Sequence, residues 1–92
     1  MRVQRWRIRG RVQGVGYRWY MIRQARLLGV TGFVRNRMDG SVEALVAGPE
    51  AELEALLDWA RQGPALAEVT AIDISPASGE ELPADFSERP TL

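Results

Sequence analysis

The feature that most constrains the fold is a change of hydrophobic period near the start of the chain. Residues 4–12 alternate: Arg occupies positions 5, 7, 9 and 11, and the positions between hold Trp6, Ile8, Gly10 and Val12. A period of two is typical of a strand covered on one face, and we expect the arginine face to be solvated. From Tyr17 onward the spacing is helical, and Gly29 ends the helix. Its apolar positions are Tyr17, Tyr20 or Met21, Ala25 and Leu28.

The remaining patterns alternate between strands and one further helix. Strands are predicted over residues 31–36, 41–47 and 69–74, and the Asp39-Gly40 dipeptide predicts the turn between the first two. Gly48-Pro49 opens a helix with acidic residues in its first turn, and Gly63-Pro64 ends it. Residues 76–83 are polar and are predicted to form a loop, after which Phe86 anchors a short last strand.

The order of these elements predicts the fold class. Strand, helix, strand, strand, helix, strand is typical of a ferredoxin-like α+β sandwich (βαββαβ), in which a mainly antiparallel sheet carries two helices on one face. No internal repeat, linker or low-complexity tract divides the chain, so residues 1–92 are expected to form a single domain. At this size a monomer is the simplest expectation.

The chain contains no Cys, His or Lys, and all twelve of its basic residues are arginines. These absences exclude thiolate nucleophiles, Ser-His catalysis, zinc fingers, Schiff-base chemistry and a P-loop that uses lysine. No acidic residue precedes Asp39, so the first half holds no carboxylate cluster for a metal, and we expect neither a metal nor a cofactor. The all-arginine composition fits thermal adaptation and a GC-rich genome equally.

The net charge is zero, but the charges are unevenly distributed. Ten arginines precede residue 38, whereas all twelve acidic residues lie from Asp39 onward. Either the basic first half attracts an anion, or the two halves pair their charges, an alternative that applies to most arginines but not to Arg18. No apolar run approaches the about 20 residues of a membrane helix, and the first residues do not resemble a secretory signal. We therefore expect a cytoplasmic protein without membrane contact.

The most informative segment is residues 10–18, Gly-Arg-Val-Gln-Gly-Val-Gly-Tyr-Arg, between the first strand and the first helix. Gly14 and Gly16 allow backbone conformations that aim several N–H groups at one point in front of a helix N-terminus, which favours an anion. Arg18 adds a planar donor fork suited to a phosphate group. The alternative is a tight turn with an arginine beside it.

Asn36, at the end of the second predicted strand, is the other candidate functional residue. Its neutral amide is a poor base but can hold a water molecule by donating and accepting hydrogen bonds. The alternative is a turn-capping role next to Asp39-Gly40.

Two segments resemble the signatures of the acylphosphatase family. Residues 10–18 resemble the first signature, and Gly32-Phe33-Val34-Arg35-Asn36, followed by Gly40, Val42 and Gly48, resembles the second. The likeness extends over essentially the whole chain, although Gly16 stands where many members carry an aromatic residue. The resemblance implies the ferredoxin-like sandwich and the hydrolysis of acyl phosphates to a carboxylate and inorganic phosphate.

The resemblance also implies a role for each candidate residue. The glycine loop would cradle the phosphoryl oxygens, Arg18 would bind and orient them, and Asn36 would position the attacking water. The phosphate-binding residues would be Gln13, Gly14, Val15, Gly16, Tyr17 and Arg18. Neither signature reads the acyl group, so the substrate within this class stays open, as does the role of the acidic C-terminal segment.

The sequence offers no obvious general base near the glycine loop. An acyl phosphate has a good leaving group, and phosphoryl transfer depends mainly on positioning and charge stabilisation, so we hypothesise that the substrate's own phosphate accepts the proton of water. Two other functions stay open. An RNA-binding module shares this order of elements, but the outward face of the first strand lacks its stacking aromatic residues, so no nucleic acid is expected. A regulatory domain would bind its ligand without turnover.

Overall fold

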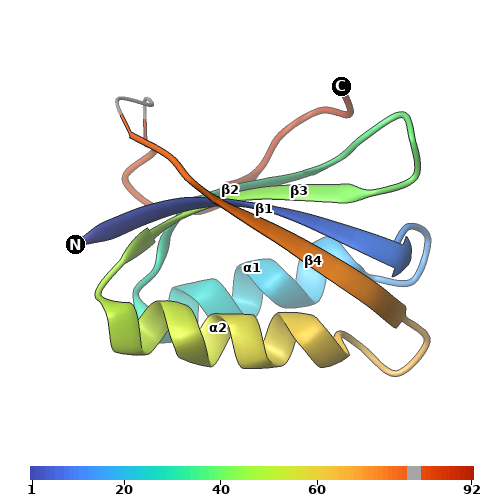
Figure 1. Cartoon of the computed structure of the whole chain (residues 1–92), viewed down its shortest axis with the longest axis horizontal. Helices are drawn as coiled ribbons and strands as arrows, with labels where there is room; N and C mark the ends of the chain where they lie inside the picture. Colours follow the sequence, from blue (N-terminus) through green and yellow to red (C-terminus); the bar gives the residue numbers. More distant parts are fainter. Residues whose placement is uncertain (79–81) are drawn as a thin grey trace.

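In residues 1–78 and 82–92, which the computed structural model describes, two helices lie on one face of a five-stranded sheet (Figure 1). The strands are β1 (Arg2–Arg11), β2 (Thr31–Asn36), β3 (Val42–Gly48), β4 (Glu68–Pro76) and β5 (Phe86–Glu88). The helices are α1 (Tyr17–Leu28) and α2 (Glu50–Gln62). The predicted ferredoxin-like arrangement and the short last strand are confirmed. Residues 79–81 of the loop predicted over 76–83 lie outside the described residues.

The sheet has the strand order β4-β1-β3-β2-β5. β3 lies between β1 and β2 and is antiparallel to both, so β1 and β2 run in the same direction. β5 pairs with β2 in parallel, through Gly32 with Phe86 and Val34 with Glu88. The carboxyl ends of β1, β2 and β5 therefore meet at one end of the sheet, where they can supply residues to a common site.

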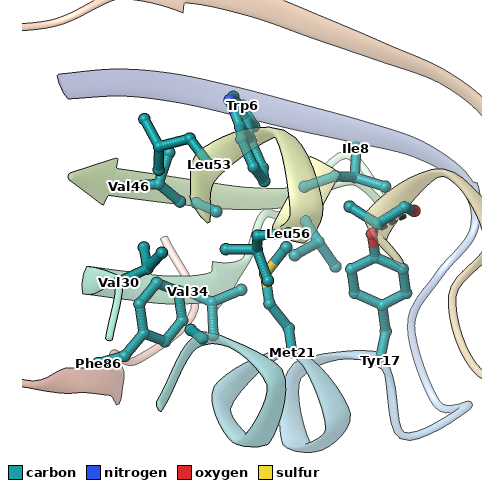
Figure 2. Close-up of a cluster of buried hydrophobic side chains, with 14 of the residues drawn as sticks. Trp6, Ile8, Tyr17, Met21, Val30, Val34, Val46, Leu53, Leu56 and Phe86 are labelled. Atoms are coloured by element: carbon teal, nitrogen blue, oxygen red, sulfur yellow. Dashed lines mark hydrogen bonds between the residues drawn. The ribbon is translucent and has the colours of Figure 1, made fainter. Parts of the chain in front are cut away.

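The hydrophobic core fills the space between the sheet and the two helices. Figure 2 shows Trp6 and Ile8 of β1 pointing toward the layer that holds Met21 of α1 and Leu56 of α2, and all four side chains are fully buried. The helical spacing left Tyr20 and Met21 as alternatives, and the structure buries Met21. None of the helices in residues 1–78 and 82–92 is long and apolar enough to cross a membrane.

Tyr17 fixes the first turn of α1 against the end of α2. Its hydroxyl donates a 2.8 Å hydrogen bond to the backbone oxygen of Ala60 (Figure 2). Its ring centroid lies 5.2 Å from that of Trp59. A buried hydroxyl without a partner would destabilise the fold, so this bond sets the position of the ring. Burial also raises the pKa of the Tyr17 hydroxyl well above its ordinary value. The start of α1 is thereby held against the last turns of α2.

The predicted alternation of residues 4–12 fails at Gly10. The pairing of β1 with β4 shifts register between Arg9 and Gly10, and Gly10 has a φ of 122°. A Cβ atom at this position would lie 2.1 Å from the backbone oxygen of Glu68, so only glycine fits. The bulge ends the regular part of β1 just before the glycine loop.

Ion pairs cluster around Glu43 on the face of the sheet opposite the helices. The buried Glu43 carboxylate accepts hydrogen bonds from Arg5 at 2.6 Å, Arg35 at 2.8 Å and Arg37 at 3.2 Å. Burial by itself would raise the pKa of Glu43, but the hydrogen bonds and charges of Arg35 and Arg5 outweigh it and lower the pKa below its ordinary value. Arg5 is thus half-buried and paired rather than solvated, as the alternative of charge pairing between the two halves predicts.

Candidate active site

The residues singled out in the sequence lie toward the end of the sheet where β1, β2 and β5 finish, but Gln13, Val15 and Asn36 are not among the residues that line the pocket found there. The glycine loop follows β1, Asn36 is the last residue of β2, and Glu88 is the last residue of β5. A pocket at this place is lined by the loop, by the first turn of α1 and by Glu88. The pocket therefore joins segments that lie far apart along the chain.

Gly14 and Gly16 give the loop its shape. Both have positive φ angles, of 73° and 83°, and Gly16 is the N-cap residue of α1. Among the described residues, no acceptor is found for the backbone N–H groups of residues 14–18, and the first turn of α1 carries neither an acidic residue nor a capping side chain. Unpaired N–H groups at the positive end of a helix dipole form an anion site.

Gln13 supports the loop with its side chain. Its Nε2 donates hydrogen bonds to the backbone oxygens of Arg37 at 2.8 Å and Ser41 at 2.9 Å, in the connection between β2 and β3. The side-chain amide nitrogen of Gln13 is therefore occupied. The same two bonds tie the base of the loop to the segment that follows Asn36.

Arg18 is paired with a carboxylate in this structure. Its Nη1 lies 2.5 Å from Oε2 of Glu88, and the two side chains are 32% and 51% exposed. The expectation that Arg18 stays outside the charge pairing is therefore wrong, and the structure places beside Arg18 a carboxylate that the sequence did not associate with the loop. Glu88 follows Arg18 by 70 residues, and the parallel pairing of β5 with β2 is what brings it there. No short-range sequence pattern signals that pairing.

Asn36 carries a buried acceptor without a partner. Among the described residues, Oδ1 of Asn36 is buried and receives no hydrogen bond. The turn beside it is capped by another residue, because Oδ1 of Asp39 accepts hydrogen bonds from the backbone N–H of Ser41 at 2.9 Å and from its hydroxyl at 2.6 Å. The turn-capping interpretation of Asn36 is therefore not supported. Buried polar atoms are nearly always satisfied, so a water or a ligand is the expected partner of Oδ1.

The described residues contain no cluster of three or more Asp, Glu, His and Cys side chains that could hold a metal ion. The positive groups at the pocket are the guanidinium of Arg18 and the N–H groups of the loop and of the first turn of α1. These groups suit a phosphoryl group, whose oxygens accept several hydrogen bonds at once.

Comparisons with known proteins point to the same chemistry. Residues 4–87 match the family model of the acylphosphatases. The chain is 59% identical over 68 residues to the acylphosphatase of Thermococcus kodakarensis, covering 74% of this chain and 75% of that one. It is 49% identical over 85 residues to acylphosphatase 2 of Ralstonia nicotianae, covering 92% and 90%. The crystal structure of acylphosphatase from Bacillus subtilis superposes with a TM-score of 0.91 at 35% identity, covering 97% and 99%. The chain therefore belongs to the acylphosphatase family, and its reaction is the hydrolysis of acyl phosphates.

Proposed function

We propose that residues 13–18 bind the phosphoryl group of the acyl phosphate, that Arg18 orients it, and that Asn36 positions the attacking water. The observation that carries this proposal is the buried, unpartnered Oδ1 of Asn36, found among the described residues at the same end of the sheet as the unpaired N–H groups of the loop. Oδ1 of Asn36 needs a hydrogen-bond donor, and the N–H groups of the loop need an acceptor. A water molecule beside a phosphoryl group supplies both.

The loop and Arg18 stabilise negative charge on the phosphoryl oxygens. The loop N–H groups are fixed by Gly14 and Gly16 before the substrate arrives, so little reorganisation is needed on binding. Arg18 exchanges the carboxylate of Glu88 for phosphoryl oxygens. That exchange has a low cost, because an exposed ion pair contributes only about 0–1 kcal/mol. The resulting contacts hold the phosphorus atom in line with the water.

Oδ1 of Asn36 accepts one hydrogen of the water and leaves its oxygen free to attack phosphorus. The new bond forms between the water oxygen and phosphorus, while the bond between phosphorus and the acyl oxygen breaks. The acyl group leaves as a carboxylate, and a non-bridging phosphoryl oxygen takes the proton of water. Neither a metal ion nor a protein base is required, since the carboxylate is a good leaving group and the activation barrier is lowered by positioning and charge stabilisation.

Three variants test these roles, with benzoyl phosphate as the substrate, a chelator present and loss of ultraviolet absorbance as the signal. Arg18→Ala is expected to lose turnover and inhibition by inorganic phosphate together. Asn36→Ala is expected to slow turnover by on the order of 10²–10³ while phosphate inhibition persists. Arg26→Ala is the matched control, because Arg26 links α1 to Asp85 at 3.1 Å, before β5 and outside the pocket. Full activity of Asn36→Ala would remove the water-positioning role.

We also propose that residues 1–92 act as one domain and as a monomer in the cytoplasm, with inorganic phosphate as the product and without binding a membrane or nucleic acid. The outer face of the sheet supports the proposal that the protein does not bind nucleic acid. Phe33 is 3% exposed and lies under the guanidinium of Arg89 at 4.1 Å, so it cannot stack on a base. Light scattering after size exclusion tests the oligomeric state.

A further inference from the structure

Two aromatic side chains are exposed beside the phosphate pocket. Trp19 is 57% exposed and Tyr20 is 43% exposed, and their rings meet edge to face with centroids 4.8 Å apart. Trp19 belongs to the lining of the pocket that contains Arg18. The Tyr20 ring lies over the loop, because a Cβ atom at Gly16 would stand 3.4 Å from its Cε2. The aromatic pair is therefore continuous with the proposed phosphate site.

A second contact, with Arg23, also holds the indole ring of Trp19 in place. The guanidinium of Arg23, one turn further along α1, lies 4.8 Å from the ring centroid of Trp19. Tyr20 and Arg23 thus hold a large side chain in place although it takes no part in the hydrophobic core. Holding an exposed ring in a fixed position costs side-chain entropy and leaves apolar surface in water. A ligand that covers the ring would remove that apolar surface from water and would meet a ring that is already ordered.

The chemistry of the substrate indicates which group would cover the Trp19 ring. In an acyl phosphate the acyl group is bonded directly to the phosphoryl group, so a phosphoryl group held by the loop and Arg18 places the acyl group at the margin of the same pocket. Trp19 is the exposed apolar side chain in that lining, where Arg18 and Glu88 are charged. Binding sites typically combine a few polar anchors with an aromatic wall in this way.

We propose that Trp19, held by Tyr20 and Arg23, is the contact surface for the acyl group, and that the substrates of this chain are acyl phosphates with an aromatic or extended apolar acyl group. The inference rests on the proposed phosphate site. It adds a residue that determines specificity and narrows the substrate class, which the phosphate-binding residues leave open. Trp19 is not required for the bond-breaking step itself.

The test compares benzoyl phosphate with acetyl phosphate as substrates of the wild-type protein and of Trp19→Ala. The wild type is expected to have the higher kcat/KM for benzoyl phosphate. Trp19→Ala is expected to lower that kcat/KM by about ten-fold, as the loss of a ring contact of about 1.4 kcal/mol implies, and to leave acetyl phosphate within about two-fold. Trp19→Phe keeps an aromatic ring and is expected to retain most of the preference. Leu27→Ala, which removes a 78% exposed apolar side chain of α1 outside the pocket, is the matched control.

A second measurement separates binding from turnover. Phenylphosphonate and methylphosphonate are used as competitive inhibitors, and only phenylphosphonate is expected to bind more weakly to Trp19→Ala. An equal loss for both substrates or both inhibitors would mean that Trp19 acts only on the structure, and an unchanged benzoyl preference would overturn the inference outright. A change of oligomeric state in Trp19→Ala would assign the ring to a subunit contact instead. Acetyl phosphate hydrolysis by Arg18→Ala tests the phosphate site separately, since activity there would contradict the proposed function whatever Trp19 does.

Discussion

In the proposed mechanism, Glu88 and the phosphoryl group compete for the guanidinium of Arg18. Oε2 of Glu88 lies 2.5 Å from Nη1 of Arg18, inside the pocket assigned to the substrate. Glu88→Gln keeps the shape of the side chain and removes its charge. Inorganic phosphate is expected to inhibit this variant more strongly than the wild type, because Arg18 no longer has an anionic partner and the phosphate no longer meets a carboxylate.

The size of the effect follows from the exposure of the pair. With side chains 32% and 51% exposed, the Arg18–Glu88 contact is largely solvated and contributes about 0–1 kcal/mol. Repulsion between a carboxylate and a phosphate charge about 4 Å apart adds about 1 kcal/mol when the dielectric is close to that of water. Together these contributions reach about 1–2 kcal/mol, which corresponds to a roughly 5- to 30-fold lower inhibition constant for phosphate.

The assay is hydrolysis of benzoyl phosphate at pH 7 with inorganic phosphate as the competitive inhibitor. The turnover number of Glu88→Gln is expected to stay within about three-fold of the wild type, whereas loss of a general base would lower it by about 10²–10⁴. Asp85→Asn is the control, because it breaks the 3.1 Å contact with Arg26 near the same strand without touching the pocket. A large fall in turnover would make Glu88 the base and refute proton transfer to the substrate. Weaker phosphate inhibition would mean that Glu88 orients Arg18 rather than competing for it.

Three further substitutions probe the support of the site and the sheet. Gln13→Ala removes both hydrogen bonds from the loop to the β2–β3 connection, and urea unfolding is expected to show a loss of about 1–3 kcal/mol together with slower turnover. In the folded protein the pKa of Glu43 lies below its ordinary value. The ionised Glu43 carboxylate therefore adds its full amount to the free energy of unfolding above about pH 4.3, and this stabilisation is lost as the pH falls through the folded pKa. Glu43→Gln should therefore show a flatter dependence of unfolding free energy on pH as the pH falls below about 4.3. At Gly32, with a φ of 137°, a Cβ atom would lie 1.8 Å from the backbone oxygen of Leu45, so Gly32→Ala is expected to lose about 3 kcal/mol or more by the same unfolding measurement.

Hydrophobic period and turn residues were enough to predict the main elements of the fold, because β1 and both helices bury regularly spaced side chains. Phe86 indicated the short last strand, and the structure buries this side chain fully in β5. Period alone could not locate the bulge at Gly10, which depends on the close approach of the Glu68 backbone from β4. A local sequence pattern does not predict contacts between strands that are far apart along the chain.

The same distinction applies to the candidate site. The local spacing of Gly14, Gly16 and Arg18 predicts an anion site, and the structure adds the unpaired N–H groups of the described loop. The sequence alone left two roles for Asn36 open, and the structure adds that Asp39 caps the neighbouring turn. Glu88 could not be identified as the partner of Arg18 without the parallel pairing of β5 with β2.

The strand order also determines when activity can first arise during folding. Gln13 reaches Ser41 across 28 positions, and Arg18 reaches Glu88 across 70. Contacts of such long range form slowly, because the intervening chain must lose its freedom before they stabilise anything. A chain that has formed its helices but has not yet docked β2 and β5 therefore has no complete pocket. Hydrolysis of an acyl phosphate during refolding would thus report the last assembly step, rather than the earlier burial of core side chains such as Trp6.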